Sequence, residues 1–219
     1  RHYFLDYALE NDAIYVHYGW SPQAQSDIST LGVNNINGIY ESEESFWRVS
    51  DKYAPHNAVT STENIMKIAE REGYRTTTSQ DPVLNYVVAE VELEDGEIAN
   101  NITIPYSYVN TVEYVYDVEL KEYVRYSRGE KQVDWDTGKT ITTKNIIIEK
   151  IDNWTIDDGT SSGRQTIDNT KEVDGYYVTN GKAIPITCTK TTRSSKTVYK
   201  DLEGNEIDVN DGKTFIQIC

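Results

Sequence analysis

The sequence predicts an α+β fold in which an N-terminal α/β region is followed by a β-rich, antiparallel C-terminal domain. Helix and strand patterns alternate over roughly the first 80 residues, and a period-two alternation of apolar residues dominates from Asn85 onward. Turn signals such as Asp95-Gly96 and Asn180-Gly181 recur through the second half. We therefore expect two domains, residues 1–83 and residues 84–219.

Short elements are expected at the start of the first domain. Residues 3–10 place apolar side chains at helical spacing, and residues 12–18 alternate as a short strand does. Ser21 followed by Pro22 is typical of a helix start, because serine caps the first turn and proline tolerates its first position. A second helix is therefore expected from Ser21 to about Thr30.

The clearest helix pattern covers residues 61–72. Thr60 and Glu63 have the spacing of a capping box, and Gly73 stands where a left-handed cap would end the helix. An apolar stripe defines the face that would pack against the rest of the domain, formed by Ile65, Ile68 and Ala69.

The second domain is expected to consist of strands. Alternating patterns predict strands at residues 86–93, 102–106, 111–118, 122–127 and 140–151. The stretch 152–173 is rich in Asp, Thr, Ser and Gly and lacks such a pattern. We expect it to be an exposed loop.

Charge and hydropathy exclude two classes of function. The chain has 36 Asp and Glu against 21 Lys and Arg, a formal net charge of -15. Such a surface repels a phosphate backbone, so no nucleic-acid partner is expected. No apolar run approaches the roughly 20 residues of a membrane-spanning helix, so the chain does not cross a bilayer.

The two cysteines, Cys188 and Cys219, do not have the spacing of a metal knuckle or a redox pair. Each can be a small buried hydrophobic residue. A disulfide between them in an oxidising compartment stays open, because only the geometry of the two strands decides it.

Three short segments of the first domain, residues 16–21, 46–48 and 54–57, concentrate polar and aromatic groups between apolar or turn residues. A histidine at a strand end before a glycine turn has the position from which α/β proteins contact ligands. An arginine beside large aromatic residues suits bidentate binding of an anion. The candidate ligand-binding residues are His17, Trp20, Ser21, Trp47, Arg48, His56 and Asn57.

Each candidate also has an ordinary structural explanation. His17 and Ser21 could serve as strand terminator and helix cap, Arg48 could pair with Asp51 or Asp6, and His56 could be satisfied by local backbone. A metal site would need His17, His56 and Asp51 together without any supporting motif, so no metal and no cofactor is expected.

No nucleophile motif stands out, and whether the chain is an enzyme stays open. The Gly19-Trp20-Ser21-Pro22 turn is not a nucleophile elbow, because Pro22 removes a backbone donor that an oxyanion hole would use.

Many short motifs along the chain resemble the YerB-like lipoproteins of Gram-positive bacteria, a family without an assigned activity. The matching segments are residues 3–6, 14–24, 36–38, 46–48, 54–57, 104–107, 114–117, 123–125, 144–148, 179–182 and 212–214. The resemblance implies an extracytoplasmic protein held to the membrane by an N-terminal lipid that lies outside this chain. It also implies that the N-terminal region is incomplete, with Arg1 the last arginine of a preceding motif.

Three hypotheses of function follow. The first is a cell-envelope lipoprotein whose N-terminal domain binds a cell-wall glycan or an anionic small molecule. The second is an envelope hydrolase or transferase acting on cell-wall polymers, with His17 or His56 as acid or base. The third is a structural or protein-interaction lipoprotein, in which the histidines lie apart.

Overall fold

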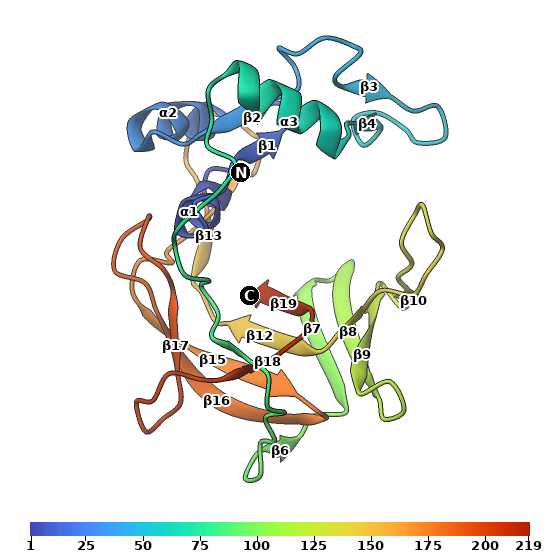
Figure 1. Cartoon of the computed structure of the whole chain (residues 1–219), viewed down its shortest axis with the longest axis vertical. Coiled ribbons are helices and arrows are strands. Elements are labelled where there is room, and N and C mark those ends of the chain that lie inside the picture. The colour runs from blue at the N-terminus through green and yellow to red at the C-terminus, as the bar shows by residue number, and fades with distance from the viewer. The chain divides into compact units, whose positions relative to one another are not determined.

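The computed structural model describes all 219 residues, and they form two compact units (Figure 1). The first unit consists of residues 1–82 together with residues 193–196, and the second of residues 83–192 and 197–219. All three helices belong to the first unit, whereas most strands belong to antiparallel sheets in the second. The chain is therefore mostly β.

The first unit is built from short elements around a parallel strand pair, β1 and β2, in which His17 lies opposite Asn37. Leu5, Ile28 and Val33 form a buried cluster on one face of this pair, and Ile36 and Phe46 belong to a cluster on the other. The elements are α1 (Phe4–Glu10), β1 (Tyr15–His17), α2 (Pro22–Leu31), β2 (Asn35–Asn37), β3 (Trp47–Arg48), β4 (Ala58–Val59) and α3 (Thr62–Arg71).

The helix starts depend on serine caps. The Ser21 hydroxyl of α2 accepts a hydrogen bond from the Ala24 amide at 3.2 Å, as expected from the sequence. The expected cap of α3 at Thr60 is wrong by one residue. Ser61 caps α3 instead, because the Thr60 hydroxyl donates to the Ser45 carbonyl at 2.7 Å.

The second unit contains the remaining strands. They are β5 (Tyr86–Val87), β6 (Glu97–Ile98), β7 (Asn101–Ser107), β8 (Asn110–Asp117), β9 (Glu122–Ser127), β10 (Glu130–Lys131), β11 (Thr142–Thr143), β12 (Asn145–Glu149), β13 (Asn153–Thr155), β14 (Gln165–Ile167), β15 (Glu172–Thr179), β16 (Lys182–Thr189), β17 (Val198–Lys200), β18 (Val209–Asn210) and β19 (Thr214–Ile218).

Two sheets organise this unit. A five-stranded sheet has the order β10-β9-β8-β7 with β11 also on β9, and a six-stranded sheet has the order β17-β16-β15-β12-β19 with β6 on β16. Successive residues of β12 point to opposite faces, so Ile146 and Ile147 enter different clusters. Ile146 packs with Tyr114 and Tyr123 of the five-stranded sheet, whereas Ile147 packs with Val209 on the other face.

Three expected boundaries differ from the structure. The expected strand 86–93 ends at Val87, because the Val91 amide and carbonyl bond the Asn210 side chain instead of a neighbouring strand. The expected strand 140–151 is interrupted at Lys144, between β11 of one sheet and β12 of the other. The expected loop 152–173 contains the antiparallel pair of β13 and β14.

Both cysteine thiols are free. Cys188 belongs to the cluster on one face of the six-stranded sheet, and Cys219 packs against the cluster on the other face. Burial raises the pKa of the Cys188 thiol to about 12. The sheet itself therefore separates the two sulfur atoms.

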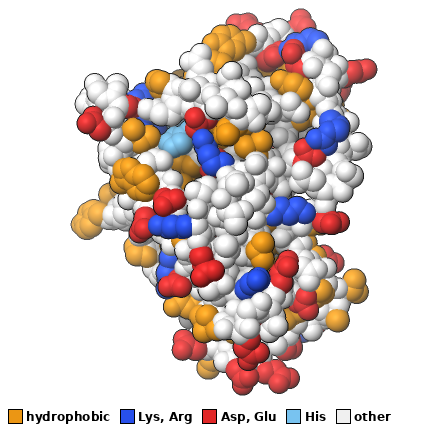
Figure 2. Space-filling view, turned by 90° about the vertical axis from the view of Figure 1, so that its left-hand side faces the viewer, with side chains coloured by type: hydrophobic (Ala, Val, Ile, Leu, Met, Phe, Trp, Pro, Cys, Tyr) orange, Lys and Arg blue, Asp and Glu red, His pale blue; other side chains and the backbone are white.

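None of the three helices has the length and hydropathy that crossing a membrane requires. On the face shown in Figure 2, acidic and basic side chains are intermingled, and exposed hydrophobic side chains are scattered among them.

Candidate functional site

Four of the seven candidate residues fall into two groups in the first unit. Arg48 and Asn57 meet on the β3–β4 hairpin, where Arg48 pairs with Ala58. His17 and Trp20 lie together at the end of β1, with their rings 5.7 Å apart. No hydrogen bond joins His17 to Arg48 or His56.

The first group, which we call the Arg48 cluster, consists of Tyr18, Arg48 and Asn57. Arg48 Nη1 donates to Asn57 Oδ1 at 2.6 Å, and Arg48 Nη2 lies 3.5 Å from the Tyr18 hydroxyl. The guanidinium carbon lies 5.2 Å from the Tyr18 ring centroid. Asn57 Nδ2 donates to the Val49 carbonyl at 3.2 Å, which turns Oδ1 toward Arg48.

The Arg48 guanidinium forms no ion pair. Asp6, one of its expected partners, is bound by Arg193 Nε at 2.7 Å, and Asp51 forms no ion pair with Arg48. An exposed guanidinium held by an amide and a phenol keeps its full charge available to an anion. His56, next to Asn57 in the chain, is exposed, and its backbone amide bonds the Tyr53 carbonyl.

His17 is held by protein atoms on both sides of its ring. Nδ1 lies 2.9 Å from the Gly19 carbonyl, and Nε2 lies 3.0 Å from Asn35 Oδ1. The Tyr15 ring stacks on the imidazole at 4.9 Å. Both ring nitrogens are therefore engaged, and His17 orients the end of β1 rather than offering a free nitrogen.

Asn37 fixes the two loops that leave the parallel strands. Its Oδ1 accepts from the Gly19 amide at 3.0 Å and from the Ile39 amide at 3.2 Å. Gly19 has φ +78°, a left-handed conformation that favours glycine. After this turn the Trp20 ring lies 5.7 Å from the His17 ring of β1 and 5.6 Å from the Tyr40 ring.

Trp20 and Tyr40 line a pocket in the first unit, which has a volume of about 490 Å³ and which we call the aromatic–amide pocket. Helix residues of α2 and α3 form two of its sides, and β2 with the following loop forms another. Its lining residues are Trp20, Gln25, Ile28, Ser29, Asn35, Asn37, Tyr40, Glu41, Ile68, Arg71, Glu72 and Tyr74.

The charges of the aromatic–amide pocket compensate one another. Arg71 Nη1 and Nη2 donate to the two oxygens of Glu41 at 2.9 and 2.8 Å, and Nε donates to Glu72 at 2.8 Å. These hydrogen bonds raise the pKa of Arg71. Because two carboxylates surround one guanidinium, the pocket offers no excess positive charge to an anion.

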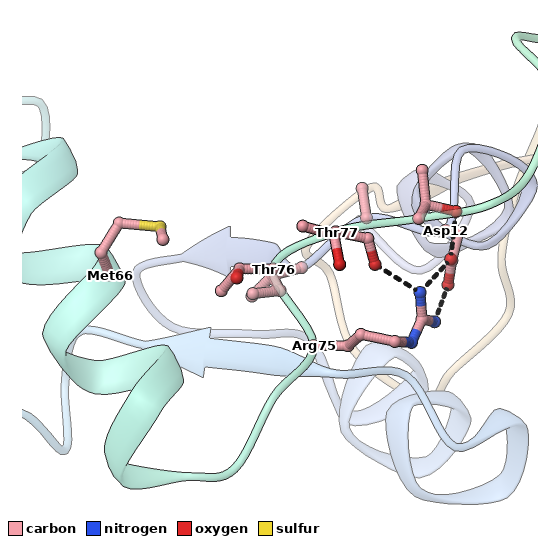
Figure 3. Close-up of a pocket in the computed structure, with 8 residues that line it drawn as sticks. Asp12, Met66, Arg75, Thr76 and Thr77 are labelled. Carbon is pink, nitrogen blue, oxygen red and sulfur yellow. Dashed lines mark hydrogen bonds and ion pairs between the residues drawn. The ribbon is translucent and has the colours of Figure 1, made fainter.

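A smaller pocket of about 190 Å³ lies beside Asp12, Met66 and Arg75 (Figure 3). Arg75 donates to both oxygens of Asp12, and the Thr78 hydroxyl donates to Asp12 at 2.6 Å. These hydrogen bonds lower the pKa of Asp12 to about 2. Its polar groups thus bind one another and fasten the segment after α3 to the end of α1.

Sequence reasoning missed most of the lining of the aromatic–amide pocket. Asn35 and Asn37 flank Ile36 on a short strand, and Tyr40 and Glu41 follow it. Polar residues at alternate positions of a strand, followed by an aromatic residue at its end, could have indicated this pocket. No group of three or more His, Cys, Asp and Glu side chains is arranged to hold a metal ion.

The comparisons with known proteins give a consistent result. Residues 1–75 match the N-terminal domain model of DUF3048, a protein of unknown function, and residues 102–216 match its C-terminal domain model. "Putative lipoprotein YerB" of Bacillus subtilis (strain 168) is 31% identical over 97% of this chain, and the chain spans 60% of that protein's length.

The crystal structure of the YerB protein from Bacillus subtilis has the same fold. The two structures match with a TM-score of 0.84 at 30% sequence identity, over 99% of this chain and 71% of the other. With both domain models matched in order along the sequence, this chain belongs to the DUF3048 family, whose function is unknown.

Proposed function

We propose that this chain is part of an extracytoplasmic, lipid-anchored protein of the cell envelope, and that its first unit binds a glycan in the aromatic–amide pocket. The similarity to a protein named as a lipoprotein supports the location. The observation that carries the binding function is the pocket itself, in which aromatic rings stand beside side-chain amides.

The composition of the pocket suits a sugar ring. The side chains of Trp20, Tyr40 and Tyr74 offer apolar surface to the C–H groups of a sugar, and the Gln25 amide offers donors and an acceptor to its hydroxyl groups. A volume of about 490 Å³ lies within the usual range of small-molecule sites. The compensated charge of Arg71 favours an uncharged glycan over an anionic one.

The test measures binding of the N-acetylglucosamine trimer, a neutral wall-type glycan, to the whole chain by calorimetry. Tyr40 is 71% exposed, so Tyr40→Ala removes a pocket wall without opening the core. We expect the affinity to fall roughly tenfold, about 1.4 kcal/mol, as loss of an aromatic contact does.

The matched control is Tyr53→Ala, because Tyr53 is 93% exposed and outside the pocket. The control should bind as the unchanged chain does. Equal affinities for Tyr40→Ala and Tyr53→Ala, or no saturable binding to the unchanged chain, would show that the pocket is not a glycan site.

A second candidate function is anion binding at the Arg48 cluster. Three other candidate residues lie near members of this cluster in the chain, since Trp47 precedes Arg48, His56 precedes Asn57, and Ser21 follows Tyr18 by three positions. The observation that favours it is the guanidinium of Arg48, which is exposed and has only an amide and a phenol as partners. Ser21 is less suited to an anion, because its hydroxyl already accepts the Ala24 amide.

The enzyme hypothesis receives less support from the geometry. General acid–base catalysis needs an imidazole with a nitrogen directed at the substrate. Both nitrogens of His17 face protein atoms, and no hydrogen bond links His56 to a carboxylate. The structural hypothesis predicts that neither the pocket nor the Arg48 cluster binds a ligand, so the same titrations test it.

A further inference from the structure

Arg125 in the second unit occupies a core-facing position of β9. Side chains alternate along a strand, so Arg125 shares a face with Tyr123, which is completely buried between the two sheets. Such a position ordinarily carries an apolar residue. A half-buried guanidinium here therefore needs a reason beyond packing.

Aromatic groups from two sheets hold this guanidinium. Tyr114 of β8 lies directly opposite Arg125 in the register, and its hydroxyl accepts from Arg125 Nε at 3.2 Å. The guanidinium carbon lies 5.1 Å from the ring centroid of Phe215 on β19 and 5.9 Å from that of Tyr114. The side chain is thus fixed while only one of its three nitrogens is used.

Neutral polar groups complete the surroundings. The Tyr106 hydroxyl donates to Gln217 Oε1 at 2.9 Å, and Gln217 is buried, with 7% of its surface exposed. Burial raises the pKa of Tyr106 to about 12 and raises that of Tyr114. Both phenols therefore keep their protons at neutral pH and carry no negative charge that could balance Arg125.

The chain supplies no carboxylate to Arg125, although its acidic residues outnumber its basic ones by 36 to 21. Four other arginines each form an ion pair with at least one carboxylate, namely Arg71, Arg75, Arg164 and Arg193. In a chain so rich in Asp and Glu, a half-buried arginine without a carboxylate in ion-pair distance is available to an external anion.

We propose that Arg125 anchors a carboxylate-binding site at this end of the space between the two sheets of the second unit. The two terminal nitrogens bind the two carboxylate oxygens, and the Tyr114 and Phe215 rings flank the bound group. A single cation in a chain of net charge -15 favours a monoanion over phosphate, which carries more charge. This inference is independent of the proposed glycan pocket.

The test is a titration of the isotope-labelled whole chain, followed in NMR spectra at the Arg125 Nε–H resonance and at the backbone amide resonances of β9 and β19, which also report binding in the variants. The carboxylate probes are acetate, for a free small acid, and N-acetyl-trialanine, for a peptide end. N-acetyl-trialanine amide and inorganic phosphate are the comparison probes. We expect saturable shifts with both carboxylates, in the millimolar range expected of such small fragments, and none with the amide.

Two variants test whether carboxylate binding depends on Arg125 in particular. Arg125→Gln should weaken carboxylate binding at least tenfold, whereas Arg128→Gln, which changes an exposed arginine of the same unit, should leave it unchanged. Tighter binding of the peptide acid than of acetate assigns the site to peptide ends, and equal binding assigns it to small acids.

A third variant tests whether Arg125 binds carboxylates if Arg125→Gln does not fold. Gln217 lies two positions after Phe215 and therefore on the same face of β19, over which Arg125 packs. Gln217→Glu adds a carboxylate to this face that can compete for Arg125, so the folded variant should no longer bind acetate. Unchanged acetate binding by Gln217→Glu would overturn the proposal. So would equal binding by Arg125→Gln, binding of the amide as strong as that of the acid, or tighter binding of phosphate than of both carboxylates.

Discussion

Arg71 in the aromatic–amide pocket and Arg48 in the Arg48 cluster belong to the same unit but have opposite surroundings. Arg71 binds both oxygens of Glu41 and one of Glu72, whereas Arg48 binds the Asn57 amide and lies against the Tyr18 phenol. The partners decide what each arginine can do. Arg71 is a structural link in the wall of a neutral pocket, and Arg48 keeps a charge that an anion can use.

The largest effect is expected from Arg193, which supports the unit that contains both regions. Its guanidinium binds Asp6, whose side chain is 4% exposed, and Asp27 at 2.8 Å. Arg193→Met leaves the buried Asp6 carboxylate without this partner and should lower the free energy of unfolding by about 2–3 kcal/mol. Chemical denaturation followed by tryptophan fluorescence measures it.

Because both regions depend on the same unit, Arg193→Met should weaken ligand binding at both of them near the unfolding midpoint. The control is Lys67→Met, which breaks only an exposed pair within α3. A loss confined to one region would show that the two do not share this support.

The second prediction concerns a variant in which the arginine of the aromatic–amide pocket, like Arg48, can bind an anion. Glu41→Gln removes the bidentate carboxylate and leaves Glu72 as the one carboxylate on Arg71, so that Arg71 Nη1 loses its charged partner. The affinity for N-acetylmuramic acid, which carries a carboxylate, should rise roughly tenfold, about 1.4 kcal/mol, while N-acetylglucosamine binding changes little. Calorimetry measures both sugars, and a parallel change for the two would contradict the charge argument.

The third prediction concerns Arg48 itself. Arg48→Gln should weaken pyrophosphate binding about fivefold, on the order of 1 kcal/mol, and should remove most of the dependence of that binding on salt. Glycan binding in the pocket should not change. Lys52→Gln is the control for general loss of positive charge, and an equal loss in both variants would rule out a specific role for Arg48.

The smallest effect is expected at the Asp12–Arg75 pair, in which a carboxylate again neutralises an arginine. The hydrogen bonds that Asp12 accepts from Arg75 and Thr78 lower the pKa of Asp12 from 3.8 to about 2. The ionised form is thus favoured in the folded state, so the stabilisation is complete above pH 3.8 and is lost as the pH falls through about 2.

Asp12→Asn should therefore lower the melting temperature slightly at neutral pH. The difference from the unchanged chain should shrink below pH 4 and be mostly lost by pH 2, where about half of the Asp12 side chains of the unchanged chain are protonated. Thermal unfolding followed by circular dichroism between pH 2 and 7 measures it. A difference that grows on acidification would contradict the pairing.

Local patterns in the sequence predicted local structure well. The Ser21-Pro22 start of α2 and the period-two strands around β7, β8 and β9 depend on interactions between near neighbours in the chain. The errors have long-range causes. Thr60 does not cap α3, because its hydroxyl donates to the Ser45 carbonyl. Residues 88–93 do not continue the strand, because the Val91 backbone bonds the Asn210 side chain.

The candidate site shows the same division. The adjacency of Arg48 and Asn57 could be expected from a hairpin, but the pocket between α2, β2 and α3 could not, because its residues come from three separate segments. Nor did any pattern indicate that Arg193 binds Asp6, since 187 positions separate them. Residues 193–196 belong to the first unit, although they are more than 100 positions away from the rest of it in the sequence.

By itself, the sequence determined the positions of the helices, the β-rich second half, the acidic charge and the resemblance to a lipoprotein family. Those features follow from composition and from periodicity over a few residues. Only the tertiary structure decided which arginines are neutralised and which are left open. An arginine's function depends on the acceptors that folding brings within about 3 Å of it, and those acceptors come from anywhere in the chain.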